Sequence, residues 1–346
     1  MARKSAALIA CANGLGHSRR VFLIADQLSK LGWQVTAFLP PQAIVRITAV
    51  FQQKIDFQIE TFNTYTSAET LCTGDSRALN WERQLPSLNK YDFVLSDNLP
   101  EILAVRSDAW LSGNFLWHEV LPEVSNQHIQ RAKSLIDAHN PMLITYGGFS
   151  SVRDTSGLHI VECTIPNPPL IPPVKKGSAL LITCGTGGKA FKVYEEFISR
   201  LSQSNADIRP FSRVFVEPNL LPDKAPCWMY PADFSQTMFE EVSVTIARPG
   251  FGIISDCTFY RIRLLAVAES GNREMQANAS RLKTLGIGDN LPNLDAAFAQ
   301  AKLDVSDSKS KETIGEKFDQ LARIWKDTPE VGLVIEAYSK ELAEGS

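Results

Sequence analysis

Short apolar runs alternate along this chain with segments of helical periodicity. The first run, residues 6–12, precedes a glycine-containing loop, and residues 21–31 then carry apolar side chains at helical spacing. Gly32 ends this helix, and residues 34–39 form the next apolar run. This strand–helix–strand order predicts a parallel sheet with a right-handed crossover.

The same alternation continues to the end of the chain. Further strands are expected at 91–96, 109–114, 142–146, 160–162, 179–183, 212–216, 227–230, 244–247 and 264–268, and later helices at 192–201, 311–326 and 330–342. The pattern predicts an α/β protein with two Rossmann-like α/β/α domains. Ligands of such open sheets bind beyond the carboxyl ends of the strands. We therefore expect the two domains to face each other across a ligand-binding cleft.

A proline-rich segment separates the two halves. Residues 166–173 contain five prolines, which a helix or a central strand would not accommodate. We expect an N-terminal domain over 1–165, a linker over 166–175 and a C-terminal domain over 176–346. In architectures of this kind the last helix often packs back on the N-terminal domain.

Composition narrows the function classes. The 346 residues are 44% hydrophobic and carry a formal net charge of −3, without the basic stretches that favour nucleic-acid binding. No apolar run reaches the roughly 20 residues of a membrane span. The six cysteines lack CxxC spacing and the five histidines are far apart, so we expect free thiols, a cytoplasmic protein and no metal site.

The most informative stretch is residues 247–256, ARPGFGIISD, which is typical of a strand end, a glycine turn and a helix start. Amide groups at such a helix start suit a diphosphate. We expect Gly250, Phe251 and Gly252 to form this turn. Arg248 would either bind the phosphate or pair with a nearby acid.

A second helix start completes the predicted nucleotide site. Glu274 and Asn278 are four residues apart and share one helix face. Glu274 would accept from the ribose hydroxyls, or it would simply complement the helix dipole. After the strand at 179–183, a turn containing Thr183, Gly185, Thr186 and Gly187 offers further backbone donors. Diphosphate plus ribose indicates a nucleotide, and we expect a nucleotide sugar.

The N-terminal half supplies candidate catalytic residues. His17 follows the first strand and is a candidate general base, or else a cap of the following helix. Asp97 ends another strand at the same sheet edge and would orient the imidazole. Gly14 and Gly16 would let a substrate approach the backbone, although the third glycine of a dinucleotide fingerprint is missing. The acceptor side would be lined from the segment that follows the 109–114 strand, at Trp117 and His118.

These segments together resemble the GT-B glycosyltransferases. The chain is most similar to the branch of the cell-wall GlcNAc transferases and the UDP-glucosyl and glucuronosyl transferases, through residues 14–17, 92–97, 114–118 and 248–278. The resemblance implies an inverting sugar transfer from a nucleotide sugar, with uridine as the base and Tyr230 in the region that contacts it. The hydroxyl acceptor is unidentified, and a lipid acceptor would bring the protein to a membrane surface.

The chain also departs from the family pattern. Asp256 stands where many members have Glu, residues 261–263 replace a Gly-x-Pro turn, and Met275 replaces Gln. No Asp-x-Asp pair is present, so we expect a metal-independent transferase with no cofactor, the nucleotide sugar being its substrate. A nucleotide-sugar hydrolase, an epimerase and a non-catalytic nucleotide-sugar-binding protein remain as alternatives.

Overall fold

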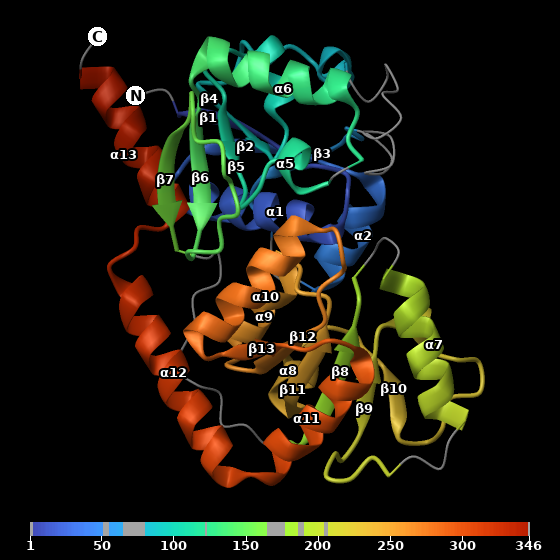
Figure 1. Ribbon diagram of the computed structural model, residues 1–346. Helices are drawn as coiled ribbons and strands as arrows, with labels where there is room; N and C mark the ends of the chain where they lie inside the picture. Colours follow the sequence, from blue (N-terminus) through green and yellow to red (C-terminus); the bar gives the residue numbers. More distant parts are fainter. Residues whose placement is uncertain are drawn as a thin grey trace. The chain divides into compact units, whose positions relative to one another are not determined.

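The structure is a computed structural model that describes residues 3–50, 55–64, 80–121, 123–164, 177–185, 190–203 and 207–344. The chain divides into two compact units (Figure 1). Unit 1 comprises Met1–Pro166 with Thr328–Ser346, and unit 2 comprises Asn167–Asp327. Each unit contains one parallel sheet flanked by helices, so the predicted two-domain α/β fold is confirmed. The predicted linker, residues 166–175, lies outside the described residues.

The sheet of unit 1 has seven parallel strands in the order β3-β2-β1-β4-β5-β6-β7. Its strands are β1 (Ser5–Ile9), β2 (Gln34–Leu39), β3 (Gln58–Thr61), β4 (Phe93–Asp97), β5 (Trp110–Ser112), β6 (Met142–Tyr146) and β7 (His159–Cys163). All residues of β4 and the last four of β1 are buried. Such continuous burial is typical of parallel strands that are covered on both faces of the sheet.

The helices of unit 1 come from both ends of the chain. They are α1 (Leu15–Lys30), α2 (Pro41–Val50), the 3₁₀ helices η1 (Trp81–Gln84) and η2 (Pro100–Ala104), α5 (Trp117–Val120), α6 (Asn126–His139) and α13 (Val331–Glu344). Helix α13 packs against α1, where the Gly332 amide donates to Gln27 Oε1 at 3.1 Å. The Trp33 indole donates to Glu336 Oε2 at 2.7 Å. The last helix is therefore part of unit 1.

The sheet of unit 2 has six parallel strands in the order β10-β9-β8-β11-β12-β13. Its strands are β8 (Ala179–Thr183), β9 (Val214–Val216), β10 (Met229–Pro231), β11 (Val242–Ala247), β12 (Arg263–Ala266) and β13 (Gly288–Asn290). Its helices are α7 (Ala190–Gln203), η3 (Pro218–Leu220), α8 (Gln236–Glu241), α9 (Phe251–Phe259), α10 (Arg273–Leu285), α11 (Leu294–Ser306) and α12 (Ser308–Lys326). Its core is formed by the apolar side chains of β8, β9, β11, α7 and α11.

The strand orders fix one ligand-binding edge in each unit. In unit 1 the order reverses between β1 and β4, and in unit 2 it reverses between β8 and β11. Loops that leave the carboxyl ends of two such strands diverge, which opens a crevice at that point of the sheet. The residues that follow these four strands are therefore the expected site residues.

Several sequence-based element assignments are wrong. Helix α1 begins at Leu15, so Gly16 and His17 belong to its first turn and not to the preceding loop. Strands β3 and β13 and helices α2, α6 and α11 have no counterpart in the expected set. Strands β3 and β13 span 4 and 3 residues and are partly polar, so periodicity gives them little signal.

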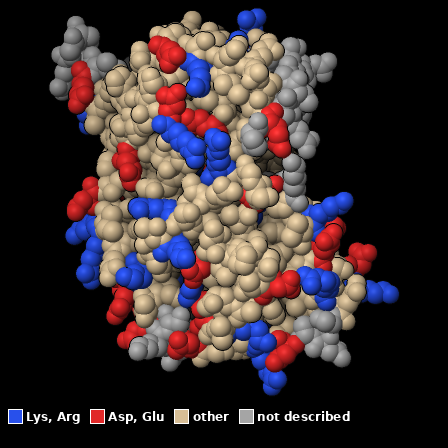
Figure 2. Space-filling model, viewed as in Figure 1, with Lys and Arg blue, Asp and Glu red and all other residues tan. Residues whose placement is uncertain are grey.

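The surface carries mixed charge. On the face shown in Figure 2, basic and acidic side chains are interspersed, in agreement with the small net charge. Among the helices described here, none combines the length and apolar character that crossing a bilayer requires. Cys11, Cys163, Cys184 and Cys257 are buried free thiols, and Cys227 is an exposed one.

Candidate functional site

His17 and Asp97 meet at the switch point of the first sheet. Gly14, whose φ of 99° favours glycine, ends the loop after β1 and leads into α1. His17 lies in the first turn of that helix, and Asp97 is the last residue of β4. Their side chains are joined by a 3.0 Å contact between His17 Nδ1 and Asp97 Oδ1. Both side chains are buried, His17 at 8% exposure and Asp97 at 0%.

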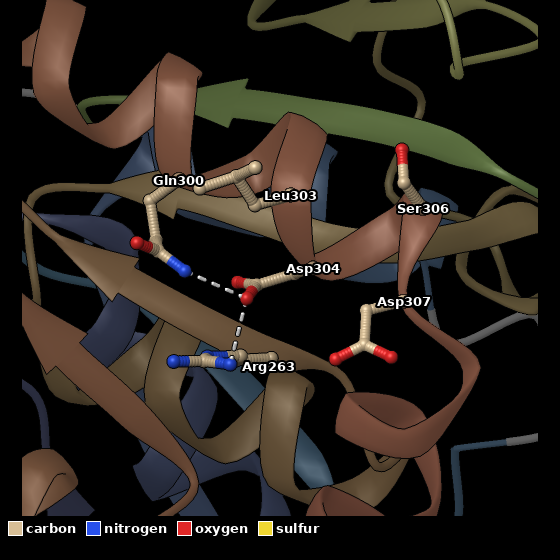
Figure 3. Close-up of a pocket in the computed structure, with 6 residues that line it drawn as sticks. All are labelled: Arg263, Gln300, Leu303, Asp304, Ser306 and Asp307. Atoms are coloured by element: carbon tan, nitrogen blue, oxygen red, sulfur yellow. Dashed lines mark hydrogen bonds and ion pairs between the residues drawn. The ribbon is translucent and has the colours of Figure 1, made fainter.

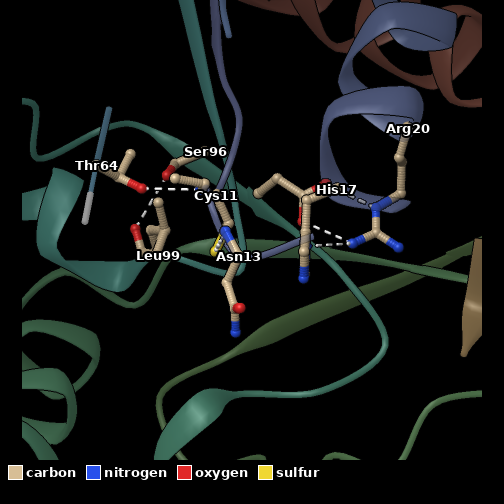
Figure 4. Close-up of polar contacts among 9 residues, drawn as sticks. Cys11, Asn13, His17, Arg20, Thr64, Ser96 and Leu99 are labelled. Carbon is tan, nitrogen blue, oxygen red and sulfur yellow. Dashed lines mark hydrogen bonds and ion pairs between the residues drawn. The ribbon is translucent and has the colours of Figure 1, made fainter. Parts of the chain in front are cut away.

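Arg20 completes this cluster (Figure 4). Its Nε donates to Asp97 Oδ2 at 2.7 Å, and its Nη2 donates to Asp97 Oδ1 at 2.6 Å. Burial by itself would raise the pKa of Asp97, but the charge of Arg20 and the hydrogen bonds from Arg20 and His17 outweigh burial and hold this pKa below its ordinary value. Asp97 is therefore an ionised, fully buried carboxylate that both neighbours share.

Aromatic rings surround the imidazole. The ring centroids of Phe115 and Trp117 lie 5.9 and 5.8 Å from that of His17. The two rings also pack edge-on against each other at 4.8 Å. Trp117, predicted on the acceptor side, is thus a neighbour of the histidine. The indole Nε1 of Trp117 is buried without a hydrogen-bond partner among the described residues.

His118 lies in a different electrostatic environment. Burial lowers its pKa to about 4, and its titratable neighbours are Glu119, His128, Lys133 and Asp154. None of these belongs to the cluster around Asp97. The Glu119 carboxylate accepts from the backbone amide of Arg153 at 3.1 Å and from that of Asp154 at 2.9 Å. The segment after Trp117 thus braces a neighbouring loop.

At the switch point of the second sheet, a carboxylate engages the predicted donor turn. Glu217 Oε2 accepts from Thr183 Oγ1 at 2.8 Å, from the Cys184 amide at 3.0 Å and from the Gly185 amide at 2.8 Å. Glu217 is buried and directly follows β9, the neighbour of β8. The Thr183 hydroxyl and the Gly185 amide, which the sequence predicts to face a nucleotide, thus donate to Glu217. Thr186 and Gly187 lie outside the described residues.

The glycine turn after β11 leads directly into a helix. Gly250 is the N-cap of α9, and no side chain caps this helix start. The helix includes Phe251 and Gly252 in its first turn. A Cβ atom built on Gly250 would meet nothing within 4 Å. Amide groups at the beginning of a helix attract anions, so this turn is a candidate diphosphate site.

Arg248 forms the ion pair that was the alternative to phosphate binding. Its Nε lies 3.1 Å from Glu269 Oε2, and both side chains are largely buried. Arg248 follows β11, whereas Glu269 follows the adjacent strand β12. The ion pair therefore joins the segments that follow two adjacent strands of one sheet.

Glu274 and Asn278 lie on one face of α10. Asn272 caps this helix by accepting from the Met275 amide at 3.2 Å. Glu274 is in the first turn at 6% exposure, and Asn278 is fully buried. Asn278 Nδ2 donates to the Pro249 carbonyl at 2.9 Å, which connects α10 to the turn before α9. The two predicted donor-binding segments are thus joined.

Arg261 and Met275, two of the residues that depart from the family pattern, are both described in the structure. Arg261 ends α9 in the left-handed region with φ 57°, where glycine would be favoured. Its Nη2 donates to the Gly315 carbonyl at 2.8 Å and to Asp319 Oδ1 at 2.5 Å. Arg261 therefore connects the end of α9 to α12. Met275 is buried at 5% exposure, a position that suits its apolar side chain.

Tyr230 lies in β10 and is 41% exposed, with its ring beneath the Arg213 guanidinium at 5.3 Å.

A separate pocket of about 510 Å³ lies elsewhere in unit 2 (Figure 3). It is lined by Arg263, Gln300, Leu303, Asp304, Ser306 and Asp307. Arg263 Nη1 and Gln300 Nε2 each donate to Asp304 Oδ1 at 2.9 Å. The pocket contains none of the predicted site residues.

Arg20 and Glu217 belong to the two polar clusters, but the sequence pattern did not indicate them as site residues. Arg20 is three positions after His17, a spacing that places both on one helix face once the helix is known to begin at Leu15. Glu217 follows an apolar run, and its importance depends on β9 lying beside β8. In the part of the chain that is described, no three His, Cys, Asp or Glu side chains are grouped as metal ligands would be.

Comparison with known proteins identifies solved structures of similar fold. No model of a protein family and no curated protein matches the chain. Among solved structures, the calicheamicin glycosyltransferase CalG4 is similar at 15% identity, with a TM-score of 0.63 over 99% of this chain and 100% of that one. LpCGTa, solved in complex with UDP, is similar at 12% identity, with a TM-score of 0.68 over 98% of this chain and 99% of that one.

The spinosyn rhamnosyltransferase SpnG, solved with thymidine diphosphate, is similar at 13% identity, with a TM-score of 0.61 over 97% of this chain and 99% of that one. The likeness covers both units in each case. The chain therefore has the two-domain α/β fold of the GT-B glycosyltransferases.

Proposed function

We propose that the chain is a glycosyltransferase that moves a sugar from a nucleotide-sugar donor to a hydroxyl acceptor. The observation that carries this proposal is the 3.0 Å contact between His17 Nδ1 and Asp97 Oδ1 at the switch point of the first sheet. A buried carboxylate that accepts from Nδ1 leaves Nε2 to receive a proton. This arrangement suits general-base catalysis on a hydroxyl group.

In the proposed reaction, His17 removes the proton of the acceptor hydroxyl. The hydroxyl oxygen attacks the anomeric carbon of the donor sugar with inversion, and the bond from that carbon to the diphosphate oxygen breaks. The nucleoside diphosphate leaves, and the proton stays on the imidazole until solvent takes it. A positioned general base typically contributes about 10²–10⁴-fold to the rate.

Unit 2 is the proposed donor-binding unit. The start of α9 at Gly250 offers backbone amides to the diphosphate, and metal-independent stabilisation of the leaving group follows from this role. Glu274 would accept from the ribose, with Asn278 holding the two segments together. The resemblance to UDP-sugar transferases makes uridine the first base to test, and SpnG makes thymidine the second.

Donor binding is tested first, by thermal shift with UDP, thymidine diphosphate and a set of nucleotide sugars. A ligand at 100 times its Kd adds about 2.7 kcal/mol to the free energy of unfolding. Transfer is then assayed with a hydroxyl-acceptor panel. We expect His17→Ala to keep donor affinity and to lower turnover at least about a hundredfold. His159→Ala, an exposed histidine on β7, is the matched control.

The same assay without an acceptor separates the alternatives. Stoichiometric release of free sugar would indicate a hydrolase, and a new isomeric nucleotide sugar would indicate an epimerase. A third candidate function is a nucleotide-sugar-binding protein that lacks turnover. Met275, which is buried and replaces the Gln of the family pattern, motivates this candidate. Tight binding without transfer across the panel would establish this reading and would overturn the proposed transferase.

A further inference from the structure

The sharing of Asp97 between a histidine and an arginine goes beyond an ordinary histidine–carboxylate pair. His17 and Arg20 are three residues apart on α1 and both reach Asp97 Oδ1, at 3.0 and 2.6 Å. Arg20 Nη2 also lies 3.3 Å from His17 Nδ1. An ionised carboxylate has no proton to donate, so the contact with Asp97 places the proton of the neutral ring on Nδ1 and leaves Nε2 unprotonated. Arg20 Nη2 is also a donor, so it bonds to Asp97 and not to the protonated Nδ1.

Arg20 changes the protonation state of His17 in which the cluster of His17, Asp97 and Arg20 is electrically neutral. A buried carboxylate and imidazole alone are neutral only when the imidazole is protonated. With Arg20 hydrogen-bonded to both oxygens of Asp97, the cluster is neutral when the imidazole is unprotonated. Since burial disfavours net charge, the arginine reverses the preference that the carboxylate alone would give.

Other side chains around the imidazole leave this charge count unchanged. From β6, the ring of Tyr146 lies 5.4 Å from the Arg20 guanidinium, and burial raises the pKa of Tyr146 above its ordinary value, so it stays neutral. Phe115 and Trp117 contribute uncharged rings. The polar contacts of His17 described here are those with Asp97 and Arg20.

We propose that Arg20 is a positioning residue that keeps His17 unprotonated at rest, by neutralising and orienting Asp97. The catalytic consequence rests on the proposed function: a base that stays empty near neutral pH can accept the hydroxyl proton. The imidazolium formed in transfer then carries an uncompensated positive charge, which favours release of its proton to solvent.

The test measures the imidazole directly and requires neither donor nor acceptor. Histidine labelled with ¹³C and ¹⁵N is incorporated into the full chain, and the His17 signals are assigned by their loss in His17→Gln. We expect the wild-type signals at pH 7 to be those of a neutral ring with the proton on Nδ1. Arg20→Gln should raise the titration midpoint of His17 by at least about one pH unit, a tenfold change in proton affinity.

Two further variants separate charge from packing. Arg20→Lys keeps the positive charge, and its midpoint should stay closer to the wild-type value than to that of Arg20→Gln. Arg19→Gln removes the same charge one residue earlier on α1 and should leave the midpoint near the wild-type value. An unchanged midpoint in folded Arg20→Gln would overturn the proposal.

An imidazolium in the wild type at pH 7 would also overturn the proposal, even if Arg20→Gln fails to fold. Failure of the proposed function would appear in the transfer assay and not in the titration of His17. If the titration behaves as expected while the acceptor panel gives no transfer, the arginine sets the protonation of His17 in a protein that is not a transferase.

Discussion

Asn278 on α10 donates from Nδ2 to the backbone carbonyl of Pro249, 2.9 Å away, and thereby holds the turn that begins α9. Its Oδ1 is buried and has no hydrogen-bond partner within the described ranges. The asparagine therefore acts as a brace between two helix starts, with one acceptor remaining unused.

Replacing this brace should affect both stability and binding. In Asn278→Ala the buried Pro249 carbonyl loses its donor, which typically costs about 1–3 kcal/mol. We expect a lower free energy of unfolding of unit 2 and weaker binding of UDP or thymidine diphosphate. Gln276→Ala, at an exposed position of the same helix, is the control for urea unfolding and calorimetric titration. Equal effects in the two variants would exclude the brace.

Glu217 should stabilise the turn after β8 through its charge. Its Oε2 accepts from one hydroxyl and two amides, and hydrogen bonds to charged groups contribute about 1.5–3 kcal/mol. We expect Glu217→Gln, which loses the charge but keeps an acceptor, to be less stable than the wild type, and Glu217→Ala to be less stable still. Glu195→Gln on the exposed face of α7 is the control. Hydrogen exchange of the β8 peptide reports the difference, and equal exchange in all variants would contradict the prediction.

A buried acid–base pair beneath α6 predicts a pH dependence for unit 1. Glu101 Oε1 lies 3.2 Å from His128 Nδ1, and both side chains are buried. Burial raises the pKa of Glu101 to about 7 and lowers the pKa of His128 to about 4. Near pH 6 the folded pair therefore holds its one proton on the carboxyl group, whereas the unfolded chain holds it on the imidazole.

The two shifts act on stability with opposite signs. The raised pKa of Glu101 makes the fold lose stability as the pH rises from about 4.5 to 7, because only the unfolded carboxyl group releases its proton there. The lowered pKa of His128 makes the fold gain stability as the pH rises from about 4 to 6.5. In the wild type these trends largely cancel between about 4.5 and 6.5.

Single replacements should therefore expose opposite slopes. Between pH 4.5 and 6.5, Glu101→Gln should become more stable with rising pH, and His128→Asn should become less stable, each on the order of 1–3 kcal/mol. Urea-dependent hydrogen exchange of unit 1 peptides measures both slopes. Parallel slopes in the two variants would show that the pair does not exchange its proton on unfolding.

How far the sequence predicted this molecule depends on the kind of signal. The sequence places Asp97 at a sheet edge because a short apolar run, residues 93–95, leads to it. The contact of Asp97 with His17 followed from two strands ending at the same edge. The pairing of β1 with β4 itself depends on the strand order, which linear periodicity does not contain.

The contacts of Arg20 and Glu217 depend on tertiary structure that the sequence pattern does not contain. Arg20 reaches Asp97 because α1 begins at Leu15, although Gly16 in its first turn disfavours a helix by up to about 1 kcal/mol relative to Ala. Helix formation here is decided by packing of the buried face of α1 and not by propensity. Likewise, Glu217 contacts the turn after β8 only because β9 is the adjacent strand.

Gly250 offers a replacement that separates binding from folding. Its φ of −69° is accessible to any residue, and an added Cβ would meet no protein atom within 4 Å. Gly250→Ala should therefore fold normally and gain up to about 1 kcal/mol of stability, because the unfolded chain becomes less flexible. If the diphosphate binds against the amides of this turn, however, the new methyl group will occupy part of its space. We expect at least about a tenfold weaker binding of the nucleoside diphosphate, or 1.4 kcal/mol.

Gly315→Ala is the matched control, since this glycine lies within α12 and an added Cβ there also has no neighbour within 4 Å. Thermal unfolding and calorimetric titration of both variants provide the comparison. Weaker binding in Gly250→Ala alone, with stability retained in both, would locate the diphosphate at the start of α9. Because neither methyl group contacts the protein, a loss of affinity at Gly250 would have to arise from the ligand. Unchanged affinity would therefore remove the α9 turn from the donor site.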